Sequence, residues 1–205
     1  MKIKLQNISF SYSQKPLLRN INLEINTGDH IWIKGRSGSG KSSLLRILAG
    51  LLKPISGTLQ INENTINEFS SEELSEFRFK YISYIHQENH LIPHWNIEQN
   101  LSLSFNKKKY SNIIQLFETF YLKQDLLKQK TLNLSGGEKQ KISLIRLLLE
   151  KKPIVLLDEP TSHLDDESTN QILNYLKVQL QNSTLVIVSH DSRLENLNFK
   201  KINFF

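Results

Sequence analysis

Apolar and polar residues alternate near the start of the chain, from Ile3 to Phe10 and again from Ile21 to Ile25. A period of two places every second side chain on one face, which is typical of antiparallel strands with one buried side. The segment Gln14 to Pro16 between them is expected to form a turn. Thr58 to Ile61 follows a second turn and is predicted to form another strand.

Two later segments, Ile154 to Leu157 and Leu185 to Val188, are apolar without interruption. Strands buried on both faces of a parallel sheet have this composition. A shorter apolar run, Ile31 to Lys34, precedes a glycine-rich loop, and Tyr81 to Ile85 is rich in β-branched and aromatic residues. We predict that these segments are strands and that a parallel sheet forms the core.

Helical periodicity appears after the glycine-rich loop, where Leu44 to Leu51 carries apolar residues on one side. Ser70 and Glu73 have the spacing of a capping box, which predicts that a helix starts there. Residues from about 97 to 134 predict helices broken by polar turns. One face of these helices is expected to carry Ile113, Leu116, Phe117 and Phe120.

These elements predict an α/β fold with a parallel core sheet, an N-terminal antiparallel β layer and a helical subdomain. The chain has 205 residues, enough for one substantial domain. We expect a single domain over residues 1–205, with a helical insertion at approximately 88–134.

Composition excludes several kinds of chemistry. The chain has no cysteine, so disulfides, thiolate metal sites and thiol catalysis are absent.

Its net charge of +6 includes short lysine runs at 107–109, 151–152 and 200–201. We interpret these runs as solvated loop faces; a nucleic-acid-binding stripe is the alternative, but no aromatic residues interleave with them. The start lacks a signal peptide and no apolar run approaches about 20 residues, which favours a cytosolic chain or one held at a membrane by a partner.

The stretch from Gly35 to Ser43 matches the pattern G-x-x-x-x-G-K-[ST] between a predicted strand and a predicted helix. Glycines let backbone N–H groups converge on phosphate oxygens at a helix N-terminus. Lys41 can reach the β- and γ-phosphates, and the Ser42 hydroxyl suits a Mg²⁺ ligand. The strand and helix around the loop favour nucleoside triphosphate binding over a chance glycine-rich turn. The residues predicted to bind the nucleotide are Gly35, Arg36, Ser37, Gly38, Ser39, Gly40, Lys41, Ser42 and Ser43.

Two acids, Asp158 and Glu159, directly follow the apolar run Ile154 to Leu157. In a chain with a phosphate-binding loop, Asp158 is expected to hold Mg²⁺ and Glu159 to polarise the attacking water. Alone, such a pair could equally be a solvated turn.

Ser135, Gly136 and Gly137 precede an amphipathic segment and predict a second helix end able to bind an anion.

Together with the phosphate-binding loop and the acid pair, the segment at Ser135 to Gly137 makes the chain resemble a known family. It resembles the ATP-binding subunit of an ATP-binding cassette (ABC) transporter over nearly its whole length. Gly35 to Ser43 resembles the Walker A loop, Ile154 to Glu159 resembles Walker B, and Leu134 to Glu138 resembles the signature motif. Ser162 to Asp165 resembles the D-loop, and Ser189 to Asp191 the switch-histidine motif. These motifs occur in the family's order.

The resemblance implies roles for further residues. Tyr12 would stack on adenine, Gln87 would contact Mg²⁺ and the lytic water, and His190 would sense the γ-phosphate. It implies catalysis by Glu159, His190 and Gln87, a Mg²⁺ site of Ser42, Gln87 and Asp158, and ATP capping by Ser135, Gly136, Gly137 and Glu138. The cofactors implied are ATP and Mg²⁺.

Each role has a structural alternative. Tyr12 could merely pack on its strand, Gln87 could be a polar strand end, and His190 could be a structural histidine. The histidines at 86, 90 and 94 recur every four residues and suggest a metal site. Pro93 interrupts any helix that would align them, and only Glu88 lies nearby as a carboxylate, so no zinc site is predicted.

Departures from the family pattern are modest. Glu138 replaces a frequent Gln, Lys141 stands where Arg is frequent, and His163 occupies a D-loop position usually filled by a small residue. None removes a γ-phosphate ligand or the catalytic acid, so an active ATPase is expected. The departures leave open the turnover rate and the D-loop packing.

The resemblance also implies partners. Two copies would face each other head to tail as a homodimer, each signature motif capping the other's ATP. A separate transmembrane permease would dock near Gln87, placing the chain on the inner face of the cell membrane. The apolar positions Leu91, Ile92, Trp95 and Ile97 are expected to line the docking groove; packing of all four in the core of the insertion is the alternative. A small export-type system is favoured.

The rival hypothesis is an ABC-type ATPase outside transport. DNA-repair and chromosome ATPases of this type place a coiled coil or zinc insert between Walker A and the signature, but here 93 positions separate Ser42 from Ser135 (135 − 42), without heptads or cysteines. Translation factors of the family carry two cassettes, and this sequence has one. No nucleic-acid partner is therefore expected.

Overall fold

The computed structural model describes residues 1–13, 15–88, 90–104 and 110–204. The predicted turn residue Gln14 and the lysine run at 107–109 lie outside the described residues. The chain divides into two compact units, described separately here. The first unit consists of Met1–Tyr84, Lys152–Glu159 and Leu180–Phe205, and the second of Ile85–Lys151 and Pro160–Gln179.

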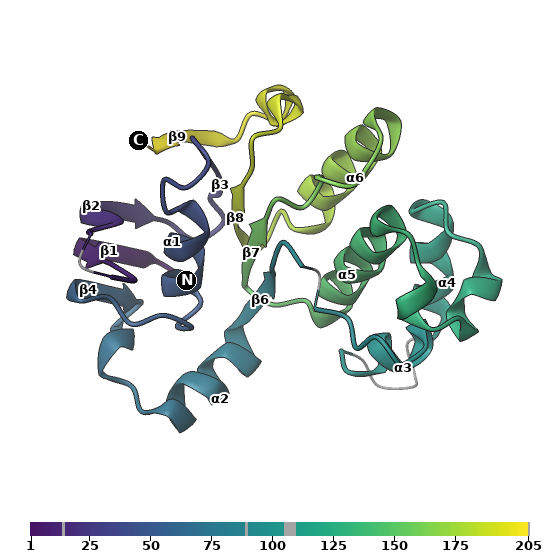
Figure 1. Ribbon diagram of the computed structural model, residues 1–205, viewed down its shortest axis with the longest axis horizontal. Coiled ribbons are helices and arrows are strands. Elements are labelled where there is room, and N and C mark those ends of the chain that lie inside the picture. Colours follow the sequence, from purple (N-terminus) through teal and green to yellow (C-terminus); the bar gives the residue numbers. More distant parts are fainter. Residues whose placement is uncertain (14, 89, 105–109, 205) are drawn as a thin grey trace. The chain divides into compact units, whose positions relative to one another are not determined.

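An antiparallel sheet of four strands in the order β2-β1-β4-β5 lies in the first unit (Figure 1). Its strands are β1 (Ile3–Phe10), β2 (Leu18–Ile25), β4 (Ser56–Ile61) and β5 (Asn64–Thr65). Ile3 pairs with Ile25 on one side and with Ile61 on the other. The apolar residues Ile3, Leu5, Ile8 and Phe10 of β1 are all buried, which confirms the predicted strand. The period of two is interrupted, because Leu5 and Ile8 are three positions apart and the pairing with β2 shifts register between them.

The second sheet has the strand order β6-β7-β8-β3-β9. It consists of β6 (Ile82–Ile85), β7 (Ile154–Asp158), β8 (Thr184–Val188), β3 (His30–Gly35) and β9 (Lys200–Phe204). The β7–β8, β8–β3 and β3–β9 pairs are parallel, and every residue of β7 and β8 is buried, as the apolar runs predicted. The expected α/β class is confirmed, although the lysines at 200–201 lie in edge strand β9 rather than in a loop.

This topology fixes where the chemical residues of the first unit meet. Both Ile33 of β3 and Asp158 of β7 pair with Val188 of β8. Parallel strands end at the same edge of their sheet, so the loops after β3, β7 and β8 emerge together.

Helix α1 (Lys41–Leu48) contacts β7 and β8, and Figure 1 shows it between the two sheets of the first unit. Its apolar residues join one core with residues from both sheets. The helix ends sooner than its apolar repeat predicted: Gly50 has a φ of 64°, and Leu51 beyond it is 49% exposed. The backbone of Gly50 therefore overrides the sequence periodicity.

Helix α2 (Ser71–Tyr81) begins at the predicted capping box, in which Ser70 accepts from the Glu73 N–H and Glu73 accepts from the Ser70 N–H. The helix extends through Tyr81, so β6 starts one residue later than the sequence pattern indicated. Two short 3₁₀ helices, η1 (Ile66–Glu68) and η5 (Ser192–Leu197), complete the first unit's described elements.

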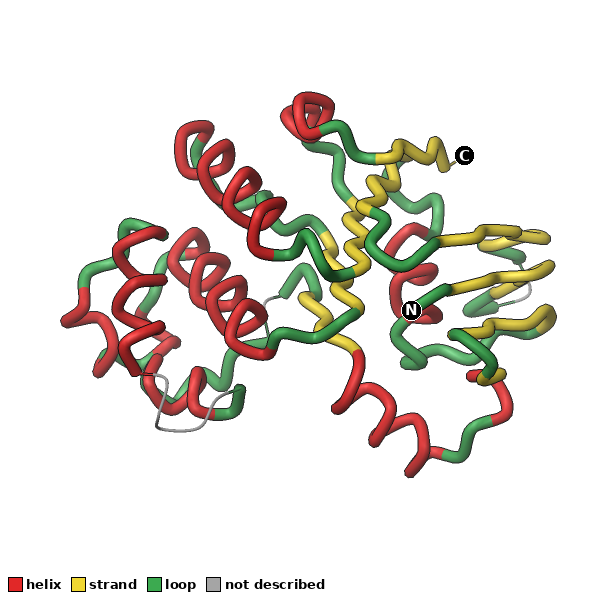
Figure 2. The backbone as a smooth tube through the Cα atoms, turned by 180° about the vertical axis from the view of Figure 1, so that it is seen from behind, coloured by secondary structure: helices red, strands yellow, loops and turns green. Residues whose placement is uncertain are grey.

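Apart from Ile85, the last residue of β6, the described residues of the second unit form helices and loops (Figure 2). Ile113, Leu116, Phe117 and Phe120 are buried, which confirms the predicted apolar face. Phe120 packs edge-on against Tyr175, with 5.9 Å between the ring centroids. The helices are α3 (Ile97–Ser102), α4 (Tyr110–Thr119), η3 (Gln124–Lys128), η4 (Thr131–Asn133), α5 (Gly136–Glu150) and α6 (Asp166–Gln179).

Across the described parts of the chain, none of the helices combines the length and apolarity that crossing a bilayer requires.

Candidate active site

The loop from Gly35 to Ser43 joins β3 to α1, as the motif predicted. Gly38 and Gly40 have φ values of 76° and 97°, in the left-handed region that favours glycine. A Cβ on Gly40 would lie 2.6 Å from Leu18 Cδ2, so the Leu18 side chain would have to shift to admit it. The left-handed backbone therefore favours glycine at the N-cap of α1.

The Lys41 side chain folds over this loop. Its Nζ donates to the carbonyls of Gly35 and Arg36 at 2.8 Å each and lies 3.3 Å from Nε2 of His190. Burial lowers the pKa of Lys41, and the negative charges of Glu159 and Asp158 oppose that shift. An ammonium group held at the loop by weak carbonyl acceptors can exchange them for phosphate oxygens.

Ser42 and Asp158 supply two oxygen atoms beside the loop. The Ser42 Oγ donates to Oδ1 of Asp158 at 3.0 Å, and Asp158 is 1% exposed at the end of β7. Hydroxyl and carboxylate oxygens are ligands that Mg²⁺ accepts, so this donor set fits the ion. Burial and the nearby Asp158 charge also raise the pKa of Tyr84 to about 12, so the Tyr84 phenol stays neutral.

Glu159 follows Asp158 with a φ of 48°, a left-handed backbone rare for a residue with a side chain. Its N–H donates to the Val188 carbonyl at 2.8 Å, which holds this conformation. Its Oε2 accepts from Ser189 Oγ at 2.8 Å and from the His190 N–H at 3.3 Å. Nε2 of His190 lies 3.8 Å from the other oxygen, Oε1. A carboxylate fixed through one oxygen presents its second oxygen to a substrate water.

Ser189 and Trp32 belong to the site although neither was predicted as a site residue. Ser189 is fully buried, and its carbonyl accepts from Trp32 Nε1 at 2.9 Å. The position of Ser189 next to His190 in the switch-histidine motif could have marked it as a site residue. The sequence around Trp32 gives no such indication, because only the pairing of β3 with β8 brings Trp32 near Ser189.

Tyr12 is 62% exposed, as expected for an aromatic residue available to a base. Its ring packs edge-on against the ring of Phe10, with 4.8 Å between the ring centroids. The hydroxyl accepts from Ser43 Oγ at 3.2 Å and from Arg46 Nη1 at 3.4 Å, which ties the ring to α1. The adenine-stacking role stays a prediction, and Arg46 is a contact that the sequence analysis missed.

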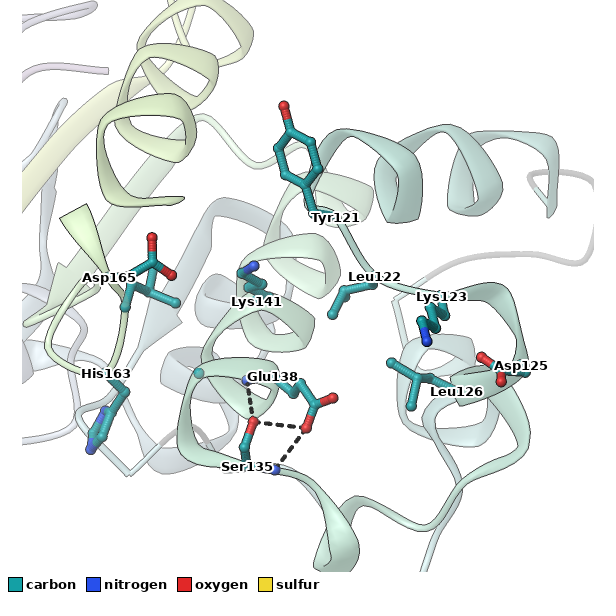
Figure 3. Close-up of a pocket in the computed structure, with 12 residues that line it drawn as sticks. Tyr121, Leu122, Lys123, Asp125, Leu126, Ser135, Glu138, Lys141, His163 and Asp165 are labelled. Atoms are coloured by element: carbon teal, nitrogen blue, oxygen red, sulfur yellow. Dashed lines mark hydrogen bonds between the residues drawn. The ribbon is translucent and has the colours of Figure 1, made fainter. Parts of the chain in front are cut away.

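The signature residues lie in the second unit, at the start of α5 (Figure 3). Ser135 Oγ and Ser135 N–H both donate to Oε2 of Glu138, at 2.7 and 2.8 Å. The Glu138 N–H donates back to Ser135 Oγ at 3.3 Å, forming a capping box. Glu138 thus performs the capping that Gln also performs, but it adds a negative charge at the helix N-terminus.

A pocket of about 520 Å³ borders these residues in the second unit, and Figure 3 shows its lining side chains. A Cβ on Gly137 would lie 2.9 Å from the His163 carbonyl, and one on Gly136 would lie 3.2 Å from the His163 ring. The glycines therefore allow the predicted D-loop to approach α5. His163 fits because its ring lies over glycine.

Gln87 is exposed in the turn after β6 and belongs to the second unit. Its predicted contact with Mg²⁺ and water therefore stays a prediction. Of the four expected docking positions, Trp95 is 38% exposed, Leu91 and Ile92 are half-buried, and Ile97 is fully buried. The prediction of a docking residue at Ile97 is wrong, because its side chain packs in the core of the second unit.

Comparison with known proteins agrees with this geometry. The sequence pattern of the ABC transporter family matches residues 18–162. The lipoprotein-releasing system ATP-binding protein LolD of Buchnera aphidicola is 36% identical, covering 94% of this chain and 89% of LolD. HrtA of Staphylococcus saprophyticus, an ATP-binding protein whose name describes hemin import, is 33% identical, covering 95% of this chain and 92% of HrtA.

A solved structure of the ATP-binding cassette MJ0796, described as a dimer in a post-hydrolysis state with ADP and Pi, superposes with a TM-score of 0.89. It is 29% identical, and the match covers 98% of this chain and 94% of that one. The chain therefore belongs to the ABC transporter family, as an ATP-binding subunit that hydrolyses ATP.

Proposed function

We propose that this chain is the ATPase of a small export-type transporter and works with a separate permease subunit at the inner face of the cell membrane. The relatives support a stand-alone subunit, because single-cassette proteins such as LolD match nearly end to end. The name of LolD describes release of lipoproteins, whereas that of HrtA describes import of hemin. Export is the direction that the first of these relatives favours.

The observation that carries the ATPase mechanism is the restrained carboxylate of Glu159 beside Lys41 and Asp158. The N–H groups of Gly35 to Ser43 and the Lys41 ammonium bind the β- and γ-phosphates. Oε1 of Glu159 accepts a proton as a water oxygen attacks the γ-phosphorus, and the bond to the ADP oxygen breaks. His190, whose N–H donates to Glu159, would contact the same phosphate.

The residues proposed to hold Mg²⁺ are Ser42, Asp158 and Gln87. When bound there, Mg²⁺ would neutralise the negative charge that develops on the phosphates during hydrolysis. Ser42 Oγ, which donates to Asp158 in the structure, is already placed beside the carboxylate that would share the ion.

We further propose that two copies form the active homodimer. The dimer described for MJ0796 supports this arrangement. Ser135, Gly136 and Gly137 of one copy would bind the γ-phosphate held by the other, using the N-terminus of α5. Residues 1–205 would act as one ATP-binding domain, with the helical insertion at approximately 88–134.

Permease docking is the part of the proposal that most needs an experiment. Trp95 exposes 38% of its surface in the segment after Gln87, where a helix-in-groove contact is proposed. We would purify the tagged full-length protein from membranes of its host as wild type, Trp95→Glu and Val178→Glu. Val178 is 61% exposed on α6 and serves as the matched control.

We expect a polytopic membrane protein to co-purify with wild type and Val178→Glu but not with Trp95→Glu. Basal ATP hydrolysis should survive in all three proteins. Equal recovery with Trp95→Glu would remove Trp95 from the docking surface. No membrane partner for wild type would contradict the transporter assignment proposed here.

A further inference from the structure

A turn of the second unit gathers three side chains with metal-binding atoms. His86, Glu88 and His90 each place one ligand atom within 4.8 Å of the other two. No metal site was predicted from the sequence, because Pro93 prevents a helix from aligning the histidines. The structure uses a turn instead, and this gathered set does not include His94.

Backbone contacts hold this turn in shape. The His90 N–H donates to the Glu88 carbonyl at 2.8 Å, and Arg146 Nη1 donates to the His90 carbonyl at 3.2 Å. The backbone of His90 is left-handed, with a φ of 42°. These contacts restrain the backbone at Glu88 and His90, two of the three residues with metal-binding atoms. Glu88 and His90 are exposed, so an ion from solvent can reach them.

The donor chemistry favours Zn²⁺. Two imidazoles and one carboxylate form the ligand set of many zinc sites that leave a fourth position for water. With bonds of about 2.0–2.2 Å, ligand atoms on a tetrahedral ion lie about 3.4 Å apart. Small side-chain rotations would close the spacing of up to 4.8 Å.

A hydrogen bond between Glu88 and His86 must open when the ion binds. The Glu88 N–H donates to Nδ1 of His86 at 3.2 Å, a long hydrogen bond on an exposed turn. If Nδ1 of His86 binds the ion, it can no longer accept this hydrogen bond. If Nε2 binds the ion, the ring proton sits on Nδ1, which again cannot accept. Opening this long hydrogen bond costs little beside the formation of three metal–ligand bonds.

We propose that His86, Glu88 and His90 bind a divalent transition-metal ion, best matched by Zn²⁺, and that the bound ion restrains the turn carrying Gln87. The second half rests on the proposed function, in which Gln87 contacts Mg²⁺ and the lytic water. Because Gln87 lies between two of the ligands, closing them on one ion restricts its backbone. Zn²⁺ then slows ATP hydrolysis.

Binding is tested by titrating Zn²⁺ into the nucleotide-free full-length protein in a calorimeter. We expect a single ion to bind, and Glu88→Gln and His90→Gln each to weaken that binding by about tenfold or more. His94→Gln is the matched control, because it removes an exposed imidazole from the same segment and should leave binding unchanged. Thermal unfolding of each variant verifies that it is folded.

Unchanged Zn²⁺ affinity in both Glu88→Gln and His90→Gln would overturn the site. A loss in His94→Gln as large as that in His90→Gln would overturn the assignment of ligands.

The restraint is tested with excess Mg-ATP and Zn²⁺ added in equal amount to the protein. Wild type should hydrolyse ATP about fivefold more slowly with Zn²⁺, while Glu88→Gln should match its own zinc-free rate. Zinc that binds to wild type without changing its rate would overturn the restraint. Absence of hydrolysis in zinc-free wild type would instead count against the proposed function.

Discussion

Ser189 holds Glu159 through a hydrogen bond of 2.8 Å from its Oγ to Oε2. Ser189 is itself restrained, because its carbonyl accepts from Trp32 and its Oγ accepts from the Asp191 N–H at 3.1 Å. The carboxylate proposed as the general base is therefore oriented by a buried hydroxyl. Ser189 acts as a positioning residue rather than touching the substrate.

Removing that hydroxyl should slow hydrolysis without weakening nucleotide binding. We expect Ser189→Ala to lower kcat by about tenfold to a hundredfold, because a small misplacement of a catalytic group has effects of this size. The KM for ATP should stay close to that of wild type. Steady-state phosphate release over a range of ATP concentrations separates the two constants.

Ser189→Thr is the control for this prediction, because threonine keeps the donor and adds one methyl group. It should recover most of the lost rate. If Ser189→Thr is as slow as Ser189→Ala, packing rather than the hydrogen bond explains the loss.

Lys41 and Glu159 should fail in different ways. Lys41→Ala removes the ammonium that neutralises phosphate charge, so ATP retention should be lost. Glu159→Gln keeps the shape but cannot accept the proton, so ATP should be retained while kcat falls by about a hundredfold or more. Nucleotide retention and phosphate release are measured on both variants. Hydrolysis by Glu159→Gln at the wild-type rate would show that the general base is another group.

Tyr12 should contribute to ATP binding through its ring. Stacking of a base on an aromatic residue is worth about 1–3 kcal/mol, so Tyr12→Ala should raise the Kd for ATP by about fivefold to a hundredfold. Tyr12→Phe keeps the ring but loses the hydroxyl contacts with Ser43 and Arg46, and should change the Kd much less. Equal losses in both variants would assign the effect to the hydroxyl.

Association should depend on the start of α5. In the Glu159→Gln background, Mg-ATP should convert a monomer to a dimer, as measured by light scattering. Adding Ser135→Arg should block this dimer while ATP binding remains, since a long side chain would fill the phosphate-capping position. Ser102→Arg, a change at an exposed serine outside the pocket, is the control and should still dimerise. Dimerisation of the Ser135→Arg protein would contradict the composite site.

Local patterns in the sequence were sufficient for much of the fold. The loop before α1, the alternation in β1 and the capping box of Ser70 and Glu73 depend on residues within a few positions of each other. Their backbone preferences and side-chain spacing operate before any distant contact forms. For this reason the segments that carry Lys41, Asp158 and Glu159 could be recognised from the sequence alone.

Local patterns were insufficient where distant segments meet. Trp32 and Ser189 are 157 positions apart and touch only because β3 pairs with β8. Ile97 has the same apolar character as the exposed Trp95, and only packing in the second unit distinguishes them.

The turn that gathers His86 and His90 shows the same limit at short range. Helical spacing was the available template, and the left-handed backbone of His90 brings the rings to 4.8 Å by another route. By itself the sequence determined which residues carry chemistry, because glycine, carboxylate and imidazole have properties independent of context. Only the tertiary structure decided which of them meet, because strand pairing, burial and turn geometry arise from the whole chain.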